Sequence, residues 1–173
     1  MTAFLRENTT GIENDGCLFS CNLGKEAIDF CFEVKDEDLI SPFSEDNEDL
    51  WQGDAVEVFL SPDGDPTHYF ELEVSPFGLR FWGEIMNPDG QTPRLKKLPP
   101  VFDAEVRRTE EGYHVRISLA YRALGAAAPD EMTFNAFRLD KMADGRQLLY
   151  ALSPTFCESF HRPKYFLKFK EVL

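Results

Sequence analysis

The 173-residue sequence has few basic residues and lacks the patterns that mark common enzyme classes. Lys and Arg number 18 against 31 Asp and Glu, which gives a formal net charge of -13. Proteins bind nucleic acids and anionic membranes through clustered Lys and Arg, so we expect neither as a partner. No Gly-rich phosphate loop, nucleophile elbow or Ser–His–Asp pattern occurs. The three histidines, His68, His114 and His161, lack metal-ligand spacing, which argues against catalytic zinc.

Long hydrophobic runs are also absent. No run approaches the roughly 20 residues of a membrane helix. The opening residues, MTAFLRENTTGIENDG, lack the apolar segment and the cleavage site of a signal peptide. We therefore expect a cytoplasmic protein if the chain is complete, and an extracellular or periplasmic one if it has been trimmed.

The four cysteines show no CxxC spacing, so a zinc knot or a redox motif is not predicted. Cys17 and Cys21 lie on one predicted strand, about 13 Å apart. That separation is too large for a disulfide. We expect reduced cysteines that behave as small hydrophobic residues.

The hydrophobic residues, 43% of the chain, fall mainly into short runs with period-two alternation. Gly, Pro, Asn and Asp separate these runs, a pattern that is typical of strands and turns. The pattern predicts one domain over residues 1–173, an antiparallel β-sandwich of the immunoglobulin or jelly-roll kind with about nine to eleven strands. Short helices are indicated only at 120–125 and in the acidic segment 36–50, which is either a solvated loop or a cation-binding loop at the rim of a site. Strands are predicted at 16–23, 26–35, 54–61, 67–74, 79–86, 102–108, 112–119, 132–140, 146–152 and 164–170.

The stretch Trp51–Val74, WQGDAVEVFLSPDGDPTHYFELEV, is predicted to form a hairpin around the turn SPDGDPT. Pairing Ser61 with Thr67 places Glu57 opposite Glu71 on the face away from the core. Like charges in that arrangement destabilise a sheet unless an arginine, a cation or ligand hydroxyls lie between them. The same face is predicted to carry two further pairs. In one, Phe59 stacks against Tyr69, and in the other Ala55 lies opposite Glu73.

Aromatic rings beside carboxylates suit a sugar, whose C–H face lies on a ring while its hydroxyls donate to the acids. Arg138 is a further candidate, because its guanidinium could bridge Glu57 and Glu71 or bind a hydroxyl. Trp82 is expected to point away from the core, as a partly covered surface residue or a second platform.

Several segments resemble the family-nine carbohydrate-binding modules and their DOMON-like relatives. The matching segments are VKDEDL, LWQGDAVEVFLSPDGDPTHYFELEVSPFG, MTFNAFRLDK and ALSPTFCESFHRPKYFLKF, which keep their order over residues 26–170. The resemblance implies a β-sandwich that binds saccharides between two aromatic rings, in many members with structural calcium.

Carried over residue by residue, Trp51 matches the first of these rings and Phe160 the second. Glu57 matches the acid that accepts sugar hydroxyls, and His161 is a structural or rim residue. Well-studied sugar binders have arginine where this chain has Glu73. The predicted carbohydrate-binding residues are Trp51, Glu57, Tyr69, Glu71, Glu73, Arg138, Phe160 and His161.

The predicted function is non-catalytic carbohydrate binding, with a saccharide ligand and a glycoside hydrolase as the candidate protein partner. The first alternative is a degenerate module that serves as a structural or protein-interaction domain. A small glycosidase is a second, because Glu71 and Glu73 lie about 6.6 Å apart along a strand, within the rough 5–9.5 Å range of catalytic pairs. A haem-binding domain is a third, although Met132, Met142 and His161 fit no ligand spacing.

Overall fold

The structure is a computed structural model that describes residues 1–125 and 131–172, and most of its regular structure is β-strand. The short helices η1 (Leu50–Gln52), η2 (Tyr121–Leu124), η4 (Pro163–Tyr165) and α1 (Phe169–Val172) interrupt the strands. No helix in the described ranges has the length and hydrophobicity needed to cross a bilayer. The strands are β1 (Thr2–Glu7), β2 (Glu13–Leu23), β3 (Ala27–Lys35), β4 (Ala55–Ser61), β5 (His68–Val74), β6 (Arg80–Met86), β7 (Arg94–Lys97), β8 (Asp103–Arg108), β9 (Gly112–Ala120), β10 (Thr133–Lys141), β11 (Gln147–Ala151) and β12 (Leu167–Lys168).

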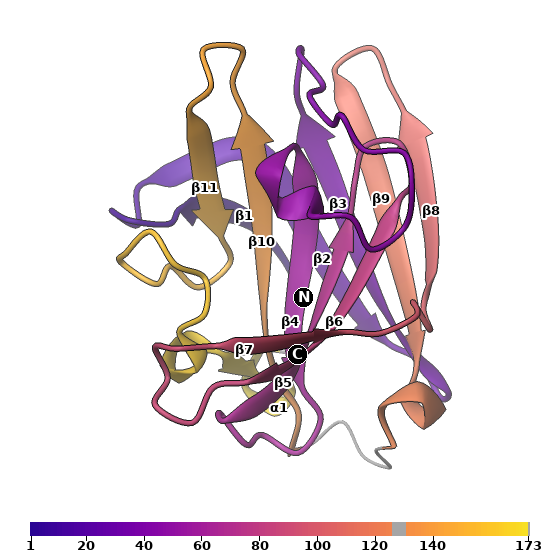
Figure 1. The fold of residues 1–173 in the computed structure, drawn as a ribbon, viewed down its shortest axis with the longest axis vertical. Coiled ribbons are helices and arrows are strands. Elements are labelled where there is room, and N and C mark those ends of the chain that lie inside the picture. The colour runs from indigo at the N-terminus through magenta and orange to yellow at the C-terminus, as the bar shows by residue number, and fades with distance from the viewer. Residues whose placement is uncertain (126–130, 173) are drawn as a thin grey trace.

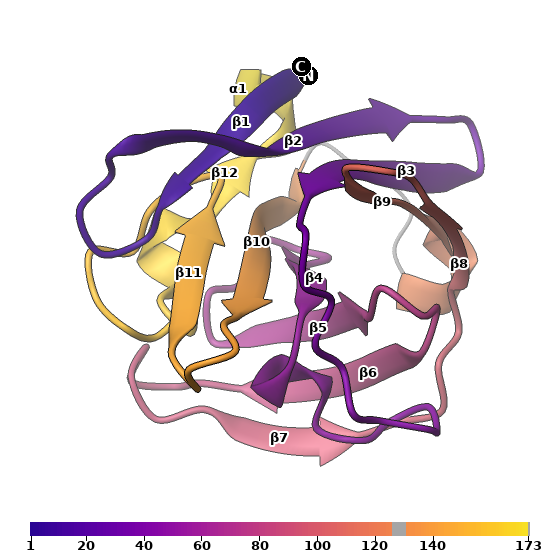
Figure 2. The same cartoon turned by 90° about the horizontal axis from the view of Figure 1, so that it is seen from above.

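All these strands belong to one antiparallel sheet in the order β7-β6-β5-β4-β10-β11-β1-β2-β3-β9-β8, with β12 paired to β10. The sheet curls, so that the half made of β4 to β7 lies across from the half made of β2, β3, β9 and β8 (Figure 2). The two termini lie close together (Figures 1 and 2). This arrangement confirms the predicted all-β sandwich; β1 and β7 are the two strands that the alternation pattern did not predict.

The main core lies between the two halves of the curled sheet and is rich in aromatic rings. Phe19 and Phe32 meet edge to face with ring centroids 5.1 Å apart, and Phe134 stacks on Phe169 at 4.2 Å. Aromatic contacts of this kind contribute about 0.5–1.5 kcal/mol beyond the area they bury. The core is therefore assembled by strands from both halves together with the C-terminal helix α1.

Trp82 belongs to this core, which corrects the expectation that it points outward. Its indole is buried and stacks on Phe70 at 4.9 Å. Trp82 pairs with Leu72 across β5 and β6, and residues that pair directly share a face of the sheet. Phe81 and Ile85, which alternate with Trp82 along β6, are also buried but lie on the other side of the sheet.

The outer face of β4, β5, β6 and β10, which points away from the main core, is also covered. A second apolar cluster forms there beneath the segment 152–166 that connects β11 to β12. Asn8 at the end of β1 anchors this segment, since its amide donates to Thr155 Oγ1 at 2.8 Å and accepts from the Thr155 N–H at 2.9 Å. The cluster comprises Ala55, Phe59, Tyr69, Ile85, Phe137, Leu139, Ala151 and Phe160.

The register of the β4–β5 hairpin differs by two residues from the predicted one. Glu57 faces Glu73 rather than Glu71, and Phe59 faces Glu71. Thr67 does not pair with Ser61, because the turn bonds within itself: the Ser61 hydroxyl donates to the Asp65 carbonyl oxygen at 2.9 Å, and Thr67 N–H donates to the Asp65 carboxylate at 2.8 Å. A shift of two residues keeps every side chain on its predicted face. The expectation that the three glutamates share the outer face is therefore confirmed.

Candidate functional site

A cavity of about 670 Å³ opens on the outer face of the sheet. Its wall includes five of the eight predicted carbohydrate-binding residues: Trp51, Glu57, Glu71, Phe160 and His161. Tyr69, Glu73 and Arg138 are not part of the wall. In the described ranges the wall contains four glutamates and neither Lys nor Arg, so the cavity is apolar and acidic.

Trp51 is held at the edge of the cavity by the turn that enters β4. It lies in η1, where its neighbour Leu50 is fully buried and anchors the turn. Gln147 of β11 fixes the backbone, because its side-chain amide donates to the carbonyl oxygens of Trp51 at 2.8 Å and Gly53 at 3.1 Å. The indole itself remains 46% exposed. A guest that stacks on this ring can remove apolar surface from water.

Phe160 is the second aromatic residue predicted to flank a sugar, and it lies in the wall of the same cavity. Its ring stacks on Phe137 of β10 with centroids 4.1 Å apart and an interplanar angle of 17°. Only 7% of Phe160 is exposed. Packing against Phe137 therefore fixes this ring in place, and Phe160 offers a guest far less free surface than Trp51 does.

Tyr69 is fully buried, so the predicted exposed platform of Phe59 and Tyr69 is wrong, although the two rings do stack at 5.6 Å. The Tyr69 hydroxyl accepts from Asn87 Nδ2 at 3.1 Å and lies 2.9 Å from His161 Nδ1. Burial, with a smaller contribution from the charge of Arg162, lowers the pKa of His161 to about 4. A neutral His161 that accepts at Nδ1 carries its proton on Nε2.

The three glutamates form a buried group on the outer face. Glu57 is 2% exposed, Glu71 6% and Glu73 0%. One carboxylate oxygen from each lies within 4.8 Å of the others. Burial raises the pKa of Glu71 to about 7, against a smaller lowering effect of the neighbouring Glu73 carboxyl group. Burial and the neighbouring acids also hold the pKa values of Glu57 and Glu73 well above the usual range.

Arg138 lies on the opposite side of the sheet from the glutamates, so the prediction that it bridges Glu57 and Glu71 is wrong. It pairs with Val56, whereas its neighbour Phe137 pairs with Glu57. The guanidinium is 3% exposed and forms ion pairs with Asp36 at 3.2 Å and Asp140 at 3.1 Å.

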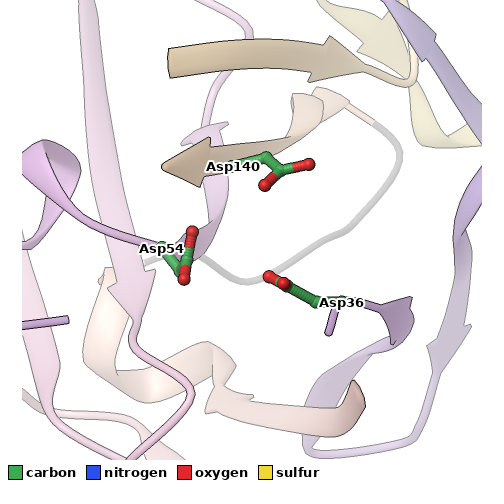
Figure 3. A group of neighbouring side chains, drawn as sticks. All are labelled: Asp36, Asp54 and Asp140. Carbon is green, nitrogen blue, oxygen red and sulfur yellow. The ribbon is translucent and has the colours of Figure 1, made fainter. Parts of the chain in front are cut away.

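Asp54 completes an aspartate cluster with Asp36 and Asp140, in which one oxygen from each residue lies within 4.8 Å of the others (Figure 3). The Asp54 carboxylate accepts from the backbone N–H groups of Lys141, at 2.6 Å, and of Ile40. Burial outweighs these two hydrogen bonds and raises the pKa of Asp54 to about 6. Three carboxylates and the Arg138 guanidinium sum to a charge of about -2 when ionised. The donor set and the charge therefore fit calcium, which takes oxygen ligands.

Sequence reasoning missed the part of the cavity wall that β1 and β11 supply. Glu7 ends β1, a strand that was not predicted, and Gln147 begins β11. The alternation in the N-terminal segment TAFLRE was the available signal for β1. No local pattern indicates that Gln147 supports Trp51, because that contact joins residues 96 positions apart.

The fold and the cavity define a class: a β-sandwich with an open cavity on one outer face, lined by acidic and aromatic residues. A family model described as "Carbohydrate family 9 binding domain-like" matches residues 23–168. The chain belongs to this family, as the resemblance in the sequence implied.

Solved structures support the fold. A putative carbohydrate-binding protein from Bacteroides uniformis aligns with a TM-score of 0.73 at 17% identity, covering 96% of this chain and 84% of its own. A family 9 carbohydrate-binding module from Caldicellulosiruptor kristjanssonii, solved with glucose, aligns with a TM-score of 0.66 at 15% identity, covering 94% of this chain and 81% of its own. The structure of such a module from the same organism with cellotriose gives 0.65 at 15% identity, covering 94% and 77%.

A curated relative, an "Extracellular protein" of Arthroderma benhamiae, is 37% identical over 60 residues. The match covers 33% of this chain and 27% of the relative, so the chain spans about a quarter of that protein's length.

Proposed function

We propose that this chain binds a saccharide in the cavity on the outer face and carries out no reaction on it. The observation that carries the proposal is the juxtaposition of a 46% exposed indole, Trp51, with the buried carboxyl groups of Glu57 and Glu71 in one cavity wall. An apolar ring next to a few convergent polar groups is the usual composition of a small-molecule site.

Each wall residue has a distinct part in the proposed recognition. The C–H face of a pyranose stacks on Trp51, and its hydroxyls exchange hydrogen bonds with Glu57 and Glu71. The Nε2–H of neutral His161 is one further donor. Phe160 forms another part of the wall, as a ring that Phe137 already supports. Buried carboxyl groups with raised pKa values can donate as well as accept, which suits sugar hydroxyls of either role.

The family and the neighbouring structures with glucose and cellotriose support a glucose-type guest, and these two sugars are the first probes. Association with a glycoside hydrolase is part of the same proposal. Calcium at the aspartate cluster would serve a structural role, because Asp54 connects the loop after β3 to the end of β10. In that position an ion would stabilise the approach to Trp51.

Replacing Trp51 with alanine should weaken the binding of cello-oligosaccharides by at least about tenfold. The covered ring contributes on the order of 1.5–3 kcal/mol, and each 1.4 kcal/mol is tenfold in affinity. Calorimetric titration of the wild type and the variant measures the loss. Phe77→Ala is the matched control, since Phe77 is 48% exposed and is not part of the cavity wall. Equal affinity in wild type and Trp51→Ala would refute the role of Trp51, provided that both fold with the same melting temperature.

The second candidate is a protein-interaction or structural module, and the packing of Phe160 favours it. A ring that is 7% exposed and stacked on Phe137 leaves Trp51 as the one largely open aromatic platform in the wall that the described residues form. A screen against a broad glycan array separates the two candidates. Binding to any saccharide, lost in Trp51→Ala, supports the first, and a complete absence of binding supports the second.

A further inference from the structure

The group of three glutamates on the outer face, Glu57, Glu71 and Glu73, has a feature that sugar binding does not explain. Their carboxyl groups converge, with one oxygen of each within 4.8 Å of the others, although all three side chains are more than nine-tenths buried. Glu57 of β4 and Glu73 of β5 face each other directly, and Glu71 is the next residue on the same face of β5.

Glu73 lacks any partner for its charge. Neither of its carboxylate oxygens has a hydrogen-bond donor among the described residues, and none of the described ion pairs involves Glu57, Glu71 or Glu73. Buried polar groups in native structures are nearly always paired, and an isolated buried carboxylate is very unfavourable. The aspartate cluster on the other side of the sheet differs in this respect, because Arg138 and two backbone N–H groups compensate it.

A proton, the ammonium group of a guest or a metal ion could each neutralise this group. Protons neutralise the free protein, because burial raises the pKa values of all three acids, and an ammonium group or an ion that binds there displaces them. An ammonium group on a sugar would enter from the cavity, but Glu73 is not part of the cavity wall, whereas Glu57 and Glu71 are. A bare ion is small enough to contact all three. The geometry thus favours a metal ion that lies at the base of the cavity.

The ligand atoms indicate which metal. Carboxylate oxygens alone select hard cations, and Ca²⁺ takes six to eight oxygens at about 2.3–2.6 Å. Two ligands on opposite sides of Ca²⁺ are thus about 4.6–5.2 Å apart, so three oxygens that lie within 4.8 Å of one another can share one such ion. Mg²⁺ usually keeps several waters and binds through one or two carboxylates, so three buried carboxylates suit Ca²⁺ better.

We propose that Glu57, Glu71 and Glu73 bind a calcium ion at the base of the cavity. The remaining coordination positions of the ion point into the cavity and take water or the hydroxyls of a guest. That last step rests on the proposed saccharide binding; the ion site itself does not.

Calcium titration of chelator-treated protein by calorimetry tests the site. Glu73→Gln should weaken calcium binding at the glutamate site by more than about tenfold. Mutating a residue that merely hydrogen-bonds to a metal ligand already costs roughly tenfold, and Glu73 is itself a ligand. Glu57→Gln is the second variant, in case Glu73→Gln fails to fold. Asp140→Asn is the matched control, since it removes one carboxylate from the aspartate cluster and should leave the glutamate site intact. Binding should also tighten from pH 6 to pH 8, because the ion displaces protons from the carboxyl groups.

The proposal is overturned if the wild type binds no calcium, if both glutamine variants bind it as the wild type does, or if Asp140→Asn abolishes all binding. Saturation by glucosamine without any calcium binding would overturn it too, in favour of an ammonium guest. Titration with cellotriose, with and without chelator, separates this proposal from the proposed function. Calcium binding without sugar binding refutes only the proposed function. If the protein binds sugar and neither the chelator nor Glu73→Gln changes that affinity, only the contact between the ion and the sugar hydroxyls is refuted.

Discussion

Glu71→Gln should become more stable relative to the calcium-free wild type as the pH rises from 4.5 to 8. Burial raises the pKa of Glu71 from 4.5 to about 7 in the folded protein. The folded wild type therefore holds a proton that the unfolded chain releases above pH 4.5. The stability that this proton provides is fully present below pH 4.5 and is lost as the pH rises through about 7.

Between pH 4.5 and pH 8, the unfolding free energy of Glu71→Gln should rise by on the order of 3 kcal/mol relative to the wild type. Each unit of pKa shift corresponds to about 1.4 kcal/mol. Urea denaturation of both proteins at a series of pH values measures this rise. Taking the difference between them cancels His161, whose lowered pKa makes stability fall with decreasing pH below its usual value of 6.5. The groups that face Glu71 are Glu57 and Glu73, whose raised pKa values have the same sign.

Glu84→Gln on β6 is the control for the direction in which the stability difference changes with pH. His68 and Lys96 hydrogen-bond to Glu84 and lower its pKa, so that this variant should lose stability relative to the wild type as the pH rises. A difference between Glu71→Gln and wild type that does not change with pH would show that Glu71 titrates normally. The free protein would then have no group of buried glutamates with raised pKa values.

The alternation of the sequence was enough to predict which side chains share a face. Glu57, Glu71 and Glu73 lie together on the outer face with Phe59, as period two requires. The register was not predicted, because Asp65 accepts hydrogen bonds from Ser61 and Thr67 and so holds these residues in the turn, and the alternation pattern does not contain those contacts.

Trp82 and Tyr69 show where alternation fails. The pattern assumes one buried and one wet face, but the segment 152–166 covers the outer face, and all seven residues of β4 are buried. Trp82 could therefore occupy the main core while Phe81 and Ile85 are buried on the other side. Cover by a distant segment is a tertiary effect, which a local pattern does not contain.

The part of the candidate site that was predictable from the sequence is the part that the β4–β5 hairpin and the turn before it supply. Trp51, Glu57 and Glu71 were found from the sequence and lie in one cavity wall. Gln147 and Glu7 were not, since they reach the cavity from strands distant in the sequence. Arg138 shares its face of β10 with Phe134 and Ala136, as alternation requires, but that face is the core, where Arg138 meets aspartates rather than glutamates.

Replacing Arg138 with methionine should cost about 3–5 kcal/mol of unfolding free energy in the presence of a chelator. The guanidinium is 3% exposed and pairs with Asp36 and Asp140, so its loss leaves three converging carboxylates without a counter-charge. Methionine keeps much of the side-chain volume, which limits the contribution of a cavity. Urea denaturation gives the value directly. Arg116→Met is the matched control, because its ion pair with Asp29 lies at the surface, where solvent screens it, and its loss should change the stability far less.

The same variant separates a structural from a binding role for Arg138. Arg138 lies on the core side of the sheet, away from the cavity, so folded Arg138→Met should bind cellotriose as the wild type does. Calcium should restore part of the lost stability. Without the guanidinium, the negative charge of the three aspartates has no counter-charge other than a bound ion. A variant as stable as Arg116→Met would mean that the aspartates do not depend on the guanidinium. Weakened sugar binding at unchanged stability would instead place Arg138 in the binding site.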